Sequence, residues 1–127
     1  MKEESADHLS RALRTIETAE KIFRDGDYNS VANRIYYAMF YTAKALLIQK
    51  DLRRFSKHRA VQSAFGEYFS KTNTLDSKYH RWLIDAFDKR LQGDYGDYSV
   101  TSDSVPLMLQ QAREFLEAAR LYLSQIK

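Results

Sequence analysis

The sequence contains no cysteine, one proline and four glycines among its 127 residues. The absence of cysteine excludes disulfides and thiolate metal sites. Because proline and glycine are the residues that most disfavour helices, their scarcity favours a helical protein. No apolar run approaches the length that spans a bilayer, and residues 1–10 lack the apolar core of a signal peptide. We therefore expect a cytoplasmic protein with no membrane association.

The composition that is present indicates one folded domain covering residues 1–127, because 44% of the residues are hydrophobic and 13% are aromatic. The net charge of +3 is too small to indicate nucleic-acid binding by itself. Residues 50–59 nevertheless carry five Lys or Arg residues against one acid. This basic segment is either a solvated loop between helices or a surface for phosphate or a partner.

Residues 30–50 form the segment around which the chain is organised. They are apolar or aromatic nearly all round at helical spacing, which is typical of a helix in the middle of a bundle. Arg34 lies near the start of this helix, where burying an unpaired charge is costly. We therefore expect Arg34 either to reach an acidic partner or to face a groove.

Four further helices are predicted, at residues 3–24, from a Ser56 cap to about 69, 76–91 and 104–126. Gly26 is expected to end the first helix, with Asp27, Asn29 or Ser30 capping the next. Pro106 fits the first turn of the last helix. Residues 93–98, with two glycines, are predicted as a turn. The pattern predicts an all-α, up-and-down bundle of four long helices and one short helix.

Four features, in this order along the chain, resemble the HEPN domain family of small prokaryotic helical bundles. They are Asn33-Arg34-Ile35-Tyr36-Tyr37-Ala38-Met39-Phe40, Ala45-Leu46-Leu47 with a basic linker ending in Lys57-His58, the helix of Phe65 and Phe69, and Arg90 with Asp94-Tyr95. The resemblance covers almost the whole chain. It implies a homodimer that binds RNA or a nucleotide and works with a small nucleotidyltransferase in a toxin–antitoxin module.

The resemblance also implies where a ribonuclease site would lie. The family's nuclease motif is an arginine followed after four to six residues by a histidine, late in the bundle. Here the arginine is Arg90, but positions 95–97 hold Tyr95, Gly96 and Asp97. The missing histidine argues against an enzyme.

A different pair, Arg53 and His58, has the nuclease spacing but lies in the basic segment. As a metal-independent endoribonuclease, the chain would use His58 as the base for the ribose hydroxyl and a nearby arginine on the phosphate. His58 is alternatively an ordinary residue at a helix start. A third possibility is a non-catalytic interaction module, with the central and last helices forming a partner interface.

The candidate ligand-binding groove is expected to combine basic and aromatic residues with one carboxylate. Its members are Arg34, Tyr37, Arg54, His58, Arg90, Asp94 and Tyr95. Asp94 is also a candidate ion-pair partner for Arg34, although the alternative is that Asp94 and Tyr95 simply form a turn. His8 and His80 are predicted to face solvent. We expect no metal and no cofactor, because the chain has no glycine-rich phosphate loop and no zinc pattern.

Overall fold

The computed structural model describes residues 1–95 and 100–126, and for residues 94 and 95 it describes the backbone alone. Over these residues the chain is helical and contains no strand, which confirms the predicted all-α class. The elements in chain order are α1 (Glu3–Arg24), α2 (Tyr28–Gln49), α3 (His58–Phe65), the short π-helix η1 (Gly66–Ser70), α4 (Ser77–Tyr95) and α5 (Val105–Gln125).

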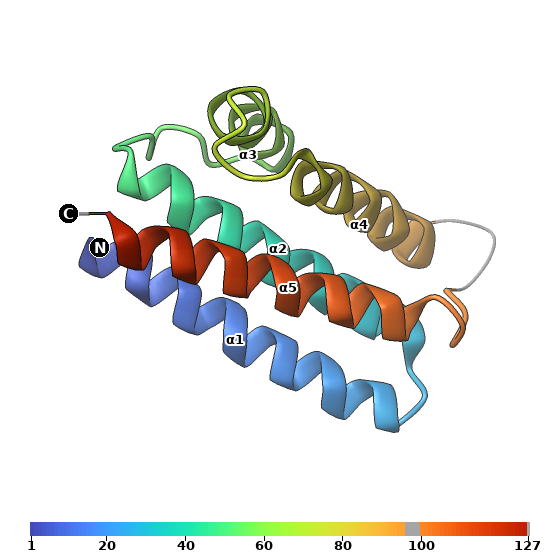
Figure 1. Cartoon of the computed structure of the whole chain (residues 1–127). Coiled ribbons are helices and arrows are strands. Elements are labelled where there is room, and N and C mark those ends of the chain that lie inside the picture. The colour runs from blue at the N-terminus through green and yellow to red at the C-terminus, as the bar shows by residue number, and fades with distance from the viewer. Residues whose placement is uncertain (96–99, 127) are drawn as a thin grey trace.

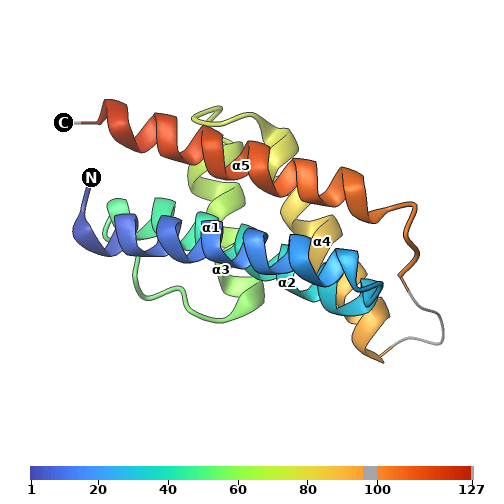
Figure 2. The ribbon, with the colours of Figure 1, turned by 90° about the horizontal axis from the view of Figure 1, so that it is seen from below.

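Helix α2 lies in the middle of the bundle. α1 and α5 run alongside it, and α3 and α4 cover its other side (Figure 1; Figure 2). Most of its residues from Val31 to Ile48 are buried, which matches the apolar pattern that surrounds this helix in the sequence. The N- and C-termini lie at the same end of the bundle (Figure 1). None of the helices within the described residues is both long enough and apolar enough to cross a bilayer.

Local sequence signals set several helix ends as predicted. Gly26 takes the left-handed conformation, with φ of 83°, directly after α1. The Asp27 carboxylate accepts a hydrogen bond from the backbone N–H of Ser30 and so caps α2. Pro106 lies in the first turn of α5, where its missing N–H removes no helical hydrogen bond.

Two predicted boundaries are wrong. α3 begins at His58, with Lys57 rather than Ser56 at the cap position. α4 does not end at Leu91 but continues through Gly93 to residue 95. A Cβ at Gly93 would lie 3.3 Å from both Asn29 Oδ1 and Val100 Cγ2. This glycine therefore permits close packing of α4 on Asn29 and Val100 and does not start a turn.

Candidate functional site

His58, the first residue of α3, is half-buried among aromatic side chains of α2 and α4. Its imidazole lies with ring-centroid distances of 5.0 to 5.8 Å from four neighbours: Tyr36, Tyr37, Phe40 and Phe87. The histidine is therefore held on the side of α2 that α3 and α4 cover, and it is not a free side chain of the basic loop.

Two hydrogen bonds connect Gln62, Tyr36 and this histidine. The Gln62 side-chain amide donates to the Tyr36 hydroxyl over 3.1 Å, and that hydroxyl lies 2.8 Å from His58 Nδ1. Because the Tyr36 oxygen accepts from the Gln62 amide, its own O–H is available to donate, and we assign that hydrogen bond to His58 Nδ1. The Nδ1 lone pair is thereby occupied. The neutral imidazole then carries its hydrogen on Nε2 and can donate it to a ligand.

The surroundings favour this neutral form. Burial lowers the pKa of His58 below its ordinary value, and the positive charge of Arg90 lowers it further. Burial also raises the pKa of Tyr36 to about 12. At neutral pH the phenol therefore keeps its hydrogen and the imidazole is uncharged.

Two arginines lie over aromatic rings that contact the histidine. The Arg90 guanidinium, from α4, lies over the rings of Tyr36 and Tyr37 at 5.8 and 5.3 Å from their centroids. Arg59 follows His58 on α3, and its guanidinium lies 5.4 Å from the centroid of the Phe87 ring. Contacts of this kind hold each guanidinium plane beside an aromatic surface. We call Tyr36, Tyr37, His58, Arg59 and Arg90 the His58 site.

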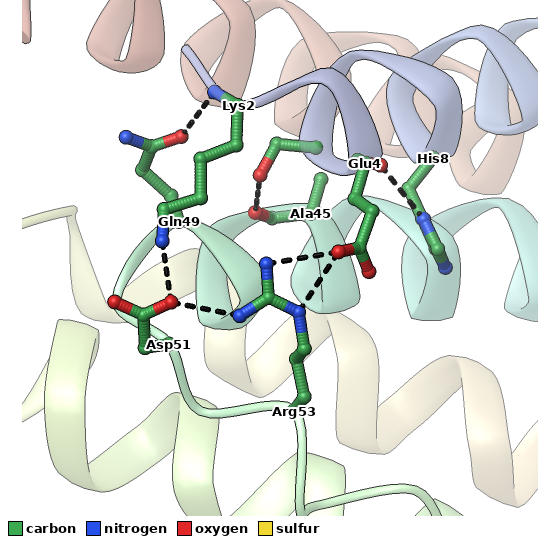
Figure 3. Close-up of polar contacts among 8 residues, drawn as sticks. Lys2, Glu4, His8, Ala45, Gln49, Asp51 and Arg53 are labelled. Atoms are coloured by element: carbon green, nitrogen blue, oxygen red, sulfur yellow. Dashed lines mark hydrogen bonds and ion pairs between the residues drawn. The ribbon is translucent and has the colours of Figure 1, made fainter.

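Arg53, the other half of the predicted catalytic pair, is directed elsewhere. Its guanidinium donates to Glu4 over 3.0 Å and to Asp51 over 2.7 Å (Figure 3). Lys2 also pairs with Asp51, so the start of α1 is tied to the loop after α2. Among the described residues, the polar contacts of Arg53 are these carboxylates and not His58.

Arg34 is exposed near the start of α2. It lines a separate cavity of about 230 Å³, together with Ile22, Asn29, Ser30 and Asn33. This cavity shares no lining residue with the His58 site.

The remaining predicted residues divide in two. Arg54 is exposed, with its guanidinium 4.5 Å from the ring centroid of the adjacent Phe55. The side chains of Asp94 and Tyr95 lie outside the described residues, and so does the predicted pair of Asp94 with Arg34. Of the predicted groove, the structure brings together Tyr37, His58 and Arg90.

Sequence reasoning missed Gln62 and undervalued Tyr36, which was expected only as a core residue. Gln62 is buried, as is Tyr36, and together they orient His58. His58 and Gln62 are four residues apart, which places them on one face of a helix. A polar residue at that spacing on an otherwise apolar helix face was the available signal.

The described part of the chain holds no group of three His, Cys, Asp or Glu side chains that could bind a metal ion. What it offers is an all-α bundle with a neutral histidine, two arginines over neighbouring aromatic rings, and the half-buried ring of Tyr37. Such a site suits an anionic, base-bearing ligand.

The chain belongs to the HEPN domain family, whose model matches residues 5–123. It is 30% identical over 116 residues to "Putative toxin MJ0142" of Methanocaldococcus jannaschii, covering 91% of this chain and 78% of that protein. It is 33% identical over 118 residues to a "UPF0332 protein" of Thermotoga maritima, covering 92% and 89%. A further match, 28% identical over 126 residues, is "Putative toxin MJ0605" of M. jannaschii, covering 99% and 93%. The resemblance drawn from the sequence is confirmed at the level of the family.

Proposed function

We propose that this HEPN protein binds RNA, or a nucleotide of the same chemistry, at the His58 site. In this proposal it acts as a homodimer with a small nucleotidyltransferase partner in a toxin–antitoxin-like module. The names of two relatives support a toxin-like role. The RNA-binding part of the proposal depends on the geometry of the site.

The observation that carries the proposal is that Arg59 and Arg90 each lie over aromatic rings that contact the His58 imidazole. Two guanidinium groups and one Nε2–H supply donors for phosphate oxygens. Tyr37 is half-buried and leaves part of its ring for a base. Stacking of a base on an aromatic ring contributes about 1–3 kcal/mol, largely independent of sequence.

Fluorescence anisotropy with a labelled single-stranded oligoribonucleotide tests this proposal. Arg59→Ala is expected to weaken binding roughly tenfold, because a charge-assisted phosphate contact is lost. Arg14→Ala is the matched control, because Arg14 is exposed on α1 and its replacement removes the same positive charge. Equal losses in the two variants would show that only net charge matters, and no loss in either would remove the His58 site as the RNA surface.

The endoribonuclease alternative makes a different demand on His58. A general base needs a free lone pair, whereas here Nδ1 accepts from Tyr36 and Nε2 carries the hydrogen. This geometry favours a donor over a base. We expect RNA incubated with the protein and EDTA to remain intact. Cleavage that disappears in His58→Ala would establish the enzyme instead.

The homodimer is proposed to form through α1 and α5. These helices flank an apolar groove of about 220 Å³ that contains Leu9, Leu13 and Leu116. Leu13 remains 41% exposed there, so covering it would remove apolar surface from water. Light scattering should give a dimer for the wild type and a monomer for Leu13→Asp. The control is Leu107→Asp, because Leu107 is 58% exposed on α5 but lies outside that groove.

The nucleotidyltransferase partner is tested by co-expression. A small nucleotidyltransferase encoded beside this chain should copurify with it through size-exclusion chromatography at a fixed ratio. Independent elution of the two proteins would count against the paired module while leaving the RNA-binding proposal standing.

A further inference from the structure

A further cavity, of about 690 Å³, opens between α3, η1 and α4. We call it the α3–α4 cavity. Most of the residues that line it have polar side chains; the lining consists of Arg59, Gln62, Ser63, Gly66, Glu67, Ser70, Lys71, His80 and Ile84. The volume falls within the range of about 300–1,000 Å³ that small-molecule sites occupy.

The cavity depends on a glycine and on an unusual helix turn. A Cβ at Gly66 would lie 2.7 Å from His80 Nε2, so any larger residue would displace the imidazole. Gly66 also opens the π-helix η1, in which the Lys71 N–H donates to the Gly66 carbonyl over 2.8 Å. Single π-helical turns within helices occur frequently at functional sites. The backbone here follows a course that a regular α-helix would not give.

His80 is a fixed part of this cavity and not the solvent-facing residue expected from the sequence. It is half-buried, and its Nε2 lies 3.1 Å from the backbone carbonyl of Gln62. A carbonyl oxygen only accepts, so Nε2 carries the hydrogen. The ring is thus oriented by α3 although it comes from α4. The other ring nitrogen of His80, Nδ1, takes no part in this hydrogen bond.

The charged groups of the lining favour an anion. Arg59 and Lys71 outnumber the single carboxylate of Glu67, and the hydroxyls of Ser63 and Ser70 add hydrogen-bond donors. Arg59 is held by the Phe87 ring at the boundary between this cavity and the His58 site. We propose that the α3–α4 cavity binds a small phosphate-bearing ligand of mononucleotide size. This site is additional to the RNA-binding surface proposed above.

The test is an NMR titration of the full chain with inorganic phosphate and, separately, with AMP at constant ionic strength. We expect saturable shifts of the η1 amides and of the His80 ring, with AMP binding more tightly than phosphate. Lys71→Ala should weaken AMP binding about fivefold or more, and Glu67→Gln should strengthen it. Lys21→Ala, the same charge change on an exposed position of α1, should have no effect.

Gly66→Ala is a second variant that changes no charge. Gly66 has a helical φ of −58°, so alanine adds no backbone strain and acts only by moving His80. Circular dichroism should show an intact fold, and AMP binding should fall.

Three results would overturn the proposal. One is the absence of saturable shifts at millimolar AMP, and another is an equal loss in Lys71→Ala and Lys21→Ala. The third is shifts confined to Tyr36, Tyr37, His58 and Arg90, which would place the nucleotide at the His58 site and support the proposed function alone. Anisotropy with RNA separates the two sites further. Lys71→Ala should leave RNA affinity unchanged, and an equal loss of RNA and AMP binding would make the cavity part of the RNA surface.

Discussion

Removing the Tyr36 hydroxyl is expected to destabilise the fold measurably. Tyr36 is fully buried, and its hydroxyl is hydrogen-bonded to both Gln62 and His58. In Tyr36→Phe the ring packing is kept, but the buried Gln62 amide loses its acceptor. An unsatisfied buried polar group costs about 1–3 kcal/mol. For 127 residues, an unfolding entropy of about 2.1 cal/mol/K per residue converts 1 kcal/mol into about 4 °C of Tm.

Thermal unfolding followed by circular dichroism should therefore show a loss of about 4–12 °C in Tyr36→Phe. Tyr37→Phe is the matched control, because the hydroxyl of Tyr37 makes no hydrogen bond within the described residues. It should change the free energy of unfolding by less than about 0.5 kcal/mol. Nitrogen NMR of the imidazole adds a second readout. Wild-type His58 should carry its hydrogen on Nε2, and this preference should weaken in Tyr36→Phe.

A double variant separates the hydrogen bond from other effects of the substitution. Replacing both partners by apolar groups is close to neutral, whereas removing one leaves the other unsatisfied. Tyr36→Phe combined with Gln62→Leu should thus be less destabilised than the sum of the single variants. An unchanged Tm in Tyr36→Phe, or a wild-type His58 with its hydrogen on Nδ1, would refute the assigned direction of these hydrogen bonds.

Three further predictions concern pH and helix ends. Because the folded pKa of His58 is lowered, the unfolded chain binds more protons, so the free energy of unfolding should fall as pH drops below about 6.5. Urea midpoints at two pH values should show a smaller fall in His58→Asn, which keeps an acceptor but does not titrate; an equal fall would contradict this. Asp27→Ala removes the α2 cap and should cost about 1 kcal/mol by urea unfolding, with Asp25→Ala near neutral as the control. Gly26→Ala should cost about 1 kcal/mol through its positive φ alone, since nothing lies within 4 Å of the added Cβ, and an unchanged midpoint would show that the backbone relaxes.

The helices that could be predicted from the sequence are those whose ends depend on local chemistry. Gly26, Asp27 and Pro106 act within one or two turns, so their effects can be read without knowledge of the fold. Gly93 could not be interpreted in this way. Its neighbours Asn29 and Val100 are 71 residues apart in the sequence. In the structure they are in contact, because the Asn29 side-chain oxygen accepts a hydrogen bond from the Val100 N–H over 2.7 Å. A glycine needed for such packing resembles a turn glycine in the sequence.

The candidate site was partly predictable for the same reason. Tyr37, His58 and Arg90 were expected in one groove, and the structure brings them into contact. Arg53 was mistaken as a partner because its carboxylate contacts include Glu4, which lies 49 residues away in the sequence. Sequence spacing along the basic segment could not show that the start of α1 lies beside it. Arg34 was expected in the same groove, but it is exposed and lines a different cavity.

Gln62 connects the two proposed sites through different atoms. Its side chain donates to Tyr36 and so orients His58, while its backbone carbonyl accepts from His80 in the α3–α4 cavity. Replacing the Gln62 side chain removes the hydrogen bond to Tyr36 but leaves the backbone carbonyl that accepts from His80. Gln62→Leu is therefore expected to disturb His58 without disturbing His80. His58 is bonded to Tyr36, which in turn contacts the Gln62 side chain, whereas His80 is bonded to the Gln62 backbone carbonyl. The two sites can therefore be altered separately through this residue of α3.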